Sequence, residues 1–176
     1  MPRKLELGSG ERPREGYEHL DFRKGLPHLE HIHDLRKPLP FPANTFEEIF
    51  ADNVLEHFPW IKSLTIVKDW VRVLKPGGLL RIIVPDLTNI IDGYIKGTGM
   101  NAISSHRQVH GEMGLGGWNS KICSIIKLFG GQDHDGNYHF VAFDAELIAI
   151  LFTKAGLSNI ETSTGAGALK ASGRKI

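Results

Sequence analysis

Two glycines at the end of a short strand-like segment near the N-terminus are the first chemical signal in this sequence. Leu5 and Leu7 alternate with polar residues, as in a strand, and Gly8 and Gly10 then permit a tight turn. Backbone N–H groups at such a turn can approach a ligand closely and bind a carboxylate or a phosphate. A glycine pair also ends many strands that bind nothing, so its meaning depends on the residues farther along the chain.

Acidic and amide side chains lie at the ends of the next three predicted strands. They are Asp21, Asp34 and the pair Asp52–Asn53. Ligands of α/β sheets bind at the carboxyl ends of the strands, where these side chains would meet the glycine turn. Asp21 could accept hydrogen bonds from a ribose diol, and Asp34 could accept one from the exocyclic amine of a base. Each aspartate taken alone is equally well explained as a turn residue, but the joint arrangement favours a ligand site.

Histidines are the candidates for a general base, because the ordinary pKa of histidine lies near neutral pH. His57 follows Asn53 by four residues, although a packing role at a helix start is the more common reason for such a histidine. His139 and Gln132 belong to a dense polar stretch, residues 130–140, which could form the acceptor side of a pocket. A loop that satisfies its own polar groups explains that stretch equally well.

No metal site is expected from the sequence. His106 and His110, with Glu112 nearby, could share a helical face, and His31 and His33 could do so on a strand. Neither pair has a cysteine or a third well-spaced ligand. The single cysteine, Cys123, has apolar neighbours and is expected to be a buried thiol.

The elements that position these residues alternate between strand and helix. Apolar patterns predict strands at residues 4–7, 17–22, 31–34, 46–51, 79–84, 157–164 and 168–175. Helices are predicted where Leu64, Val67, Val71 and Leu74 share a face, at residues 88–95, and from the N-cap Asp144 to Gly156, with residues 75–78 ending the first of them. This order predicts one α/β domain, residues 1–176, with a substrate-side insertion at 97–140.

The first connection between strands is unusually short. Six residues, 11–16, separate the glycine turn from the second strand, and they include Pro13 and Gly16. A helical crossover between parallel strands takes a dozen residues or more. The first crossover helix is therefore expected to be missing or reduced to a turn.

Several ordered motifs resemble those of class I S-adenosylmethionine-dependent methyltransferases. They are Glu6–Gly10, Asp21, Asp34–Leu35 before Leu39–Phe46, Val54–Phe58, and Arg72–Gly78. The resemblance is nearest to small predicted methyltransferases with a shortened N-terminal half, some of them found beside sugar or polysaccharide biosynthesis proteins. It implies a Rossmann-like, doubly wound, mostly parallel seven-stranded sheet with an antiparallel last strand.

The resemblance also implies roles for individual residues around S-adenosylmethionine as the cofactor. Glu6, Gly8 and Gly10 would line its methionine portion, and Asp21 would bind the ribose. Asp34 and Leu35 would lie at the adenine, and Asn53 near the methionine amino group. The methyl acceptor would be a small molecule of unidentified structure, with a sugar or polysaccharide precursor as one candidate.

Two departures from the family pattern keep another function open. Arg12 stands where a third glycine is common, and the first helix has almost no residues to be built from. A non-catalytic binding or assembly module with a degenerate fold is therefore the alternative. A nicotinamide-dependent reductase is weaker, because Asp21 follows Gly10 by eleven residues where about twenty are expected.

Composition limits the classes of partner. The chain has 176 residues, 21 basic and 20 acidic side chains, and a formal net charge of +1. This balance argues against a nucleic-acid partner, and no apolar segment is long enough to span a membrane. We expect cytoplasmic residence. We also expect a homo-oligomer, or a protein partner that covers the open side of the predicted ligand crevice.

Overall fold

Seven strands form one sheet in the computed structural model, which describes residues 2–98, 120–132, 136–165 and 167–176. Their order across the sheet is β3-β2-β1-β4-β5-β7-β6. The strands are β1 (Lys4–Leu7), β2 (Glu18–Asp21), β3 (His31–Ile32), β4 (Phe46–Asp52), β5 (Leu74–Pro85), β6 (Leu157–Gly165) and β7 (Ala168–Lys175).

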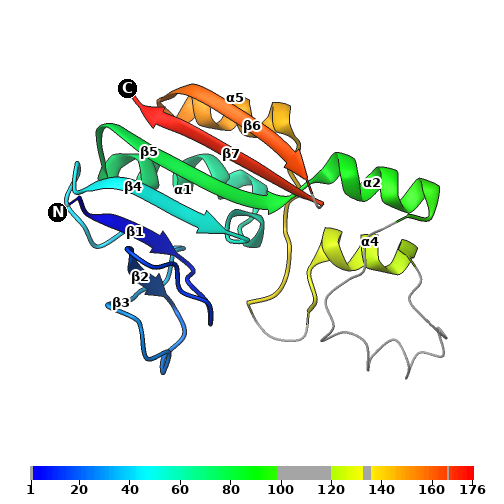
Figure 1. Cartoon of the computed structure of the whole chain (residues 1–176), viewed down its shortest axis with the longest axis horizontal. Helices are drawn as coiled ribbons and strands as arrows, with labels where there is room; N and C mark the ends of the chain where they lie inside the picture. The colour runs from blue at the N-terminus through cyan, green and yellow to red at the C-terminus, as the bar shows by residue number, and fades with distance from the viewer. Residues whose placement is uncertain (1, 99–119, 133–135, 166) are drawn as a thin grey trace.

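Four α-helices and one short 3-10 helix are described between the strands. They are η1 (Leu55–His57), α1 (Trp60–Val73), α2 (Leu87–Lys96), α4 (Ser120–Phe129) and α5 (Ala145–Ala155). Figure 1 shows α2 and α4 beyond the arrowheads of β1, β4 and β5, at the carboxyl ends of those strands. Within the described ranges, no helix combines the length and the apolar character that crossing a membrane would need.

Strand directions confirm the predicted sheet. β3, β2, β1, β4 and β5 pair in parallel, and β7 is antiparallel to both β5 and β6. β1 is central to the parallel part, since Leu5 pairs with Glu18 on one side and Ile49 on the other. The glycine turn after β1 therefore lies between the ends of β2 and β4.

The first crossover helix is absent, as predicted. No helix lies between β1 and β2, and residues 11–16 form an irregular loop instead. Arg14 holds this loop against the sheet: its N–H donates to Glu6 Oε2 (2.8 Å), and its carbonyl lies 3.0 Å from His19 Nε2. Its guanidinium lies 3.9 Å from the centroid of the Phe50 ring, a cation–π contact.

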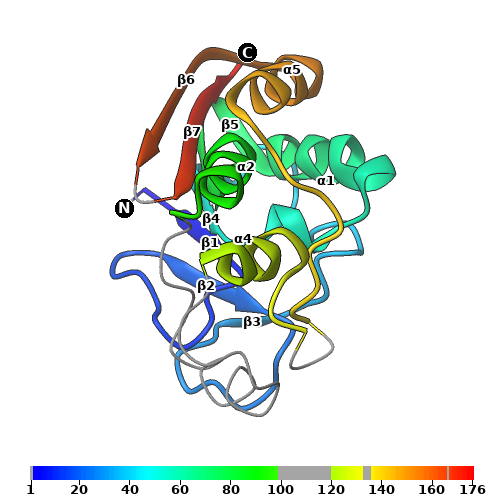
Figure 2. The ribbon, with the colours of Figure 1, turned by 90° about the vertical axis from the view of Figure 1, so that its right-hand side faces the viewer.

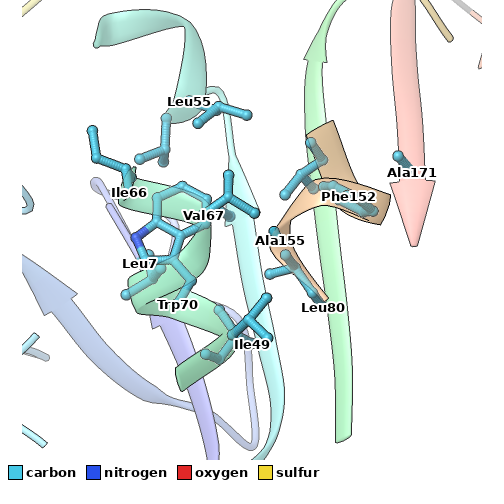
Figure 3. Packing of buried hydrophobic residues seen from close by; sticks show 14 of the residues in the cluster. Leu7, Ile49, Leu55, Ile66, Val67, Trp70, Leu80, Phe152, Ala155 and Ala171 are labelled. Carbon is cyan, nitrogen blue, oxygen red and sulfur yellow. The ribbon is translucent and has the colours of Figure 1, made fainter. Parts of the chain in front are cut away.

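The hydrophobic core lies between the sheet and helices α1 and α5, which cover the same face (Figure 2). Trp70 is the largest of its fully buried side chains, and Figure 3 shows it packed among Leu7, Ile49 and Val67. A buried indole removes a large apolar surface from water, so this contact is central to the stability of the domain.

Two sequence expectations about α1 need correction. Its buried face is built from Ser63, Ile66, Val67, Trp70 and Val71, whereas Leu64 is only half-buried. Leu74 is buried but begins β5, and residues 75–78, expected to end the helix, belong to that strand. Phe46 of β4 pairs with Leu74, and this pairing extends β5 toward the helix.

On the opposite face of the sheet, no helix is found in the part of the chain that the structure describes (Figure 2). Side chains on this face are largely polar: Glu48 lies 3.1 Å from Lys4 and 3.3 Å from Arg81. A groove of about 650 Å³ crosses the face and is lined by Arg14, Arg81 and Lys170 among others. Ion pairs on the strands let this face remain in water without a covering helix.

The predicted insertion at 97–140 contains α4, which packs against α2. Residues 99–119, which include His106, His110 and Glu112, lie outside the described residues, as do residues 133–135. The predicted boundaries of the single domain and of its insertion stay predictions.

We expect Glu18 to stabilise the edge of the sheet in a pH-dependent way. Arg3 donates two hydrogen bonds to it (2.7 and 2.8 Å), and this contact above all, helped by His31, lowers the pKa of Glu18 to about 2. Because the folded pKa lies below the ordinary value, the contribution is present above about pH 5 and is lost as the pH falls toward 2. Glu18→Gln should cost about 1 kcal/mol at pH 6, the range of a partly exposed ion pair, and much less at pH 2.

Urea unfolding of both proteins across this range measures the difference. Glu15→Gln, at an exposed loop position, is the control. A destabilisation by Glu18→Gln that is the same at pH 6 and pH 2 would contradict the ionic contribution.

Candidate functional site

The glycine turn after β1 is packed against the end of β4. Gly8 has φ +65°, and its N–H donates to the Leu20 carbonyl (2.7 Å). A Cβ at this position would lie 2.7 Å from a methyl carbon of Val54, closer than real contacts allow. Only glycine fits here, because other residues rarely adopt this backbone conformation and their Cβ would collide with Val54.

Asp21 ties the end of β2 to the same turn. Asp21 is 3% exposed. Its carboxylate accepts hydrogen bonds from the N–H of Gly10 (3.0 Å) and of Arg23 (2.9 Å). The Arg23 guanidinium also contacts it, with two N–O distances of 3.3 Å. Burial favours a raised pKa, but these contacts outweigh it and lower the pKa of Asp21. Asp21 is thus held ionised beside the glycine turn, as a carboxylate that binds hydroxyls should be.

Glu6 is buried and faces the loop that replaces the first helix. It accepts the hydrogen bond from Arg14 N–H and lies 3.6 Å from His19 Nε2. Its carboxylate therefore positions residues 11–16, and its predicted role at the methionine portion of the cofactor stays a prediction.

Asp34 and Leu35 follow β3 at the edge of the sheet. Arg36 forms a forked contact with the Asp34 carboxylate (2.7 to 3.0 Å), and this contact lowers the pKa of Asp34 to about 2. Leu35 packs partly buried against the core. The pair combines an ionised acceptor with an apolar surface, which suits the edge and face of a purine ring.

Asn53 ends β4 in a left-handed conformation, with φ +51°. Its N–H donates to the Ile83 carbonyl (2.9 Å), and its side-chain amide donates to Asp52 Oδ1 (2.8 Å). Desolvation raises the pKa of Asp52, against the opposing charges of Arg14 and Lys170. Asn53 and Asp52 are therefore the exposed polar groups where β4 meets the predicted crevice.

A second cluster lies just after β4, where Glu56, His57 and His139 come together. One ligand atom of each residue lies within 4.8 Å of the others, and the two imidazole rings are 4.9 Å apart at T-shaped geometry. The Phe140 N–H donates to the Glu56 carbonyl (2.8 Å), which joins η1 to the loop before α5. The two histidines predicted as base candidates are thus brought together by the fold.

Glu56 is the most perturbed group of this cluster. It is fully buried, and its desolvation, with a smaller effect of Asp52, raises the pKa of Glu56 to about 8. Burial also lowers the pKa of His139, aided by His57 and opposed by the Lys127 carbonyl. A neutral imidazole at pH 7 is suited to accept a proton or to bind a metal ion.

Gln132 lies in the same loop region but faces the end of α4. Its backbone has φ +56°, and its side chain donates to the Phe129 carbonyl (3.3 Å). The same carbonyl accepts the His139 N–H (3.0 Å). In the described part of this stretch, Gln132 therefore behaves as a capping residue, and its role toward a substrate stays a prediction.

Sequence reasoning assigned no role to three residues that shape these sites. Arg14 and Arg23 look like ordinary loop residues, and their contacts with Glu6, Phe50 and Asp21 depend on the tertiary fold. Glu56 stood in a motif, but a carboxylate beside an apolar residue gives no sign of full burial. The sequence feature that could have indicated the burial of Glu56 is its position directly after a buried strand.

Part of the chain matches a known protein family. Residues 17–82, which contain Asp21, Asp34, Asn53 and Glu56, match the family described as "Methyltransferase domain". No curated protein matches the chain. Because the family match begins at residue 17 and ends at residue 82, it does not cover the glycine turn or His139.

Three solved structures illustrate the similarity of fold. PH0226 protein from Pyrococcus horikoshii OT3 is 15% identical with a TM-score of 0.64, covering 99% of this chain and 82% of that one. A chain from the "Complex between the Haloferax volcanii Trm112 methyltransferase activator and the putative methyltransferase" is 13% identical with a TM-score of 0.61. The match covers 98% of this chain and 81% of that one. The citrinin polyketide synthase CMeT domain is 15% identical (TM-score 0.59; 98% and 46%), so this chain spans about half its length.

Gly8→Ala tests whether the turn depends on close packing as well as on backbone conformation. A positive φ costs an alanine about 1–2 kcal/mol, and the contact with Val54 adds about 1–3 kcal/mol. Gly16→Ala is the matched control, because Gly16 has φ +81° but nothing lies within 4 Å of its added Cβ.

Equilibrium urea unfolding should therefore show a larger loss of stability for Gly8→Ala than for Gly16→Ala. Adding Val54→Ala to Gly8→Ala should relieve the clash, so that the double variant loses less than the sum of the two single losses. Equal losses for the two glycine variants would contradict the close-packing account.

Proposed function

Since the chain has the class I methyltransferase fold, we propose that it binds S-adenosylmethionine and transfers its methyl group to a small-molecule acceptor. The observation that carries this proposal is the junction of β1, β2 and β4. There the turn of Gly8 and Gly10 is hydrogen-bonded to the ionised Asp21 and packed on Val54. The match of residues 17–82 to a methyltransferase family supports the same conclusion.

The residues present at this junction suit the cofactor. Gly8 has no Cβ, so the turn packs directly on Val54 and stays compact at the end of β1, beside the predicted ligand crevice. Asp21 would hold the ribose hydroxyls, Asp34 and Leu35 the adenine, and Asn53 with Gly10 the methionine end. For Asp21 to accept both hydroxyls, the Arg23 guanidinium must leave at least one of its 3.3 Å contacts.

When bound, S-adenosylmethionine supplies an electrophilic methyl group on a sulfonium. The chain's own part is then mainly to position the acceptor and to receive a proton where the acceptor loses one. His57 and His139 are the proposed proton acceptors, because the fold brings the two rings together at η1, directly after β4. Gln132, at the end of α4, would flank the same pocket.

The alternative is a non-catalytic module with the same fold. Two observations favour it: Arg23 already engages Asp21, and no helix covers one face of the sheet in the described ranges. A protein partner or a second copy would then occupy the uncovered side. Cofactor binding without release of S-adenosylhomocysteine across a panel of sugars, phenols and carboxylates would favour this alternative over the enzyme.

Isothermal titration calorimetry with S-adenosylmethionine and S-adenosylhomocysteine tests the proposal. The wild-type chain should show saturable binding of both. Asp21→Asn should weaken binding about 10- to 100-fold, as expected for loss of a charged hydrogen-bond acceptor worth about 1.5–3 kcal/mol.

Glu47→Gln is the matched control, because Glu47 is an exposed carboxylate that pairs with Lys75 near the start of β4. It should bind as the wild type does. Absence of binding to the wild-type chain at millimolar ligand would refute both the enzyme and the cofactor-binding module.

A further inference from the structure

Three side chains that the proposed cofactor pocket does not use converge beside it. Glu56 and His57 belong to η1, and His139 comes from the loop before α5, more than eighty residues later in the chain. Their ligand atoms lie within 4.8 Å of one another. The backbone bond from Phe140 to Glu56 holds the two segments together, so the cluster is positioned by the fold.

Both histidines are oriented in the same way. His57 Nδ1 lies 3.0 Å from the Tyr138 carbonyl, and His139 Nδ1 lies 2.8 Å from the Lys127 carbonyl. Because a carbonyl only accepts, each Nδ1 carries the proton and each Nε2 carries the lone pair. A backbone carbonyl on one ring nitrogen is the usual support for a histidine that binds metal through the other.

Glu56 would supply negative charge to the site once a bound ion displaces its proton. Its side chain is fully buried, and neither carboxylate oxygen has a hydrogen-bond partner within the described part of the chain. A buried carboxyl group without donors is costly unless it binds a proton or a cation. The nearby Asp52 adds further negative charge and offers no compensation.

We propose that Glu56, His57 and His139 form a binding site for one divalent transition-metal ion, with Zn²⁺ as the best-fitting ion. Two imidazoles and one carboxylate are a common ligand set of zinc sites that keep an open position, and Fe²⁺ uses the same set. Mg²⁺ and Ca²⁺ prefer all-oxygen ligands and fit less well.

Binding requires a small contraction of the cluster. Ligands about 2.1 Å from a tetrahedral zinc ion lie about 3.4 Å apart, so the ligand atoms must move by about 1 Å. Side-chain rotation can supply this movement without breaking the Phe140–Glu56 backbone bond. The ion would link η1 to the loop before α5 and stabilise both.

Three protein ligands leave a coordination position for an outside oxygen atom. While the ion is bound, the two Nε2 lone pairs are its ligands, so the histidines hold the ion and do not act as the proton acceptors proposed for the ion-free chain. If the proposed methyl transfer holds, that position would suit the oxygen of an alcohol or phenol acceptor, and this consequence alone rests on the proposed function. The metal site itself can be tested without cofactor or acceptor, so its failure is distinct from that of the methyltransferase proposal.

The test is calorimetric titration of chelator-treated, dialysed protein with ZnCl₂. One Zn²⁺ should bind per chain and raise the melting temperature. Glu56→Gln and His139→Gln should each weaken binding by about a hundredfold or more, since even outer partners of metal ligands contribute about 10- to 100-fold. His31→Gln, on β3 and outside the cluster, is the histidine control and should leave binding unchanged.

Two outcomes would overturn the site: no saturable Zn²⁺ binding by the wild-type chain, or unchanged binding by folded Glu56→Gln. Circular dichroism identifies a variant that fails to fold. The wild-type chain with Co²⁺ gives a test that is independent of any variant. A tetrahedral Co²⁺ ion held by two imidazoles and a carboxylate should produce an intense visible absorption band. Absence of that band under saturating Co²⁺ would also count against the site.

Discussion

The contact of Arg14 with the first strand is the constraint on which the rest of the structure depends. Its N–H binds Glu6, its guanidinium covers Phe50, and its carbonyl meets His19. Together these contacts let a loop of a few residues return the chain to β2 in parallel, where a helix ordinarily does so. Together with the backbone pairing of β1 and β2, they hold Asp21 beside the glycine turn.

The geometry of the site also depends on the pairing of β1 with β4. Gly8 must lie close to Val54 because β1 and β4 are direct neighbours, and η1 begins immediately after Val54. The same short segment therefore contacts the glycine turn and carries Glu56 and His57. The proposed cofactor pocket and the proposed metal site are thus coupled through packing of adjacent residues. A substitution at Gly8 is therefore expected to alter both proposed sites.

Much of the fold could be predicted, for identifiable reasons. Alternating apolar residues in β1 and the continuous apolar run of β5 report burial directly, and the shortness of residues 11–16 excluded a helix by chain length alone. The buried face of α1 was predicted in part, since Val67 and Val71 are buried, but Trp70 was left out of it and Leu64 is only half-buried. Trp70 packs on the sheet residues Leu7 and Ile49, and Leu64 lies at the margin of the same core.

The site was less predictable than the fold. Gly8, Gly10 and Asp21 could be found because they end strands, where local sequence carries the signal. Arg14 and Arg23 could not, since their partners depend on tertiary contacts. Glu56 could not, because its place after a buried strand does not by itself show that the carboxylate is buried. His57 and His139 were found separately, and only the fold shows that they meet.

A crystal structure of the chain with S-adenosylhomocysteine tests the central claim most directly. We predict ribose hydroxyls within hydrogen-bond distance of Asp21, the Arg23 guanidinium moved from that carboxylate, and the homocysteine portion along Gly8 and Gly10. Ligand bound elsewhere, with the Asp21–Arg23 contact intact and no density at the ends of β1 and β2, would contradict it.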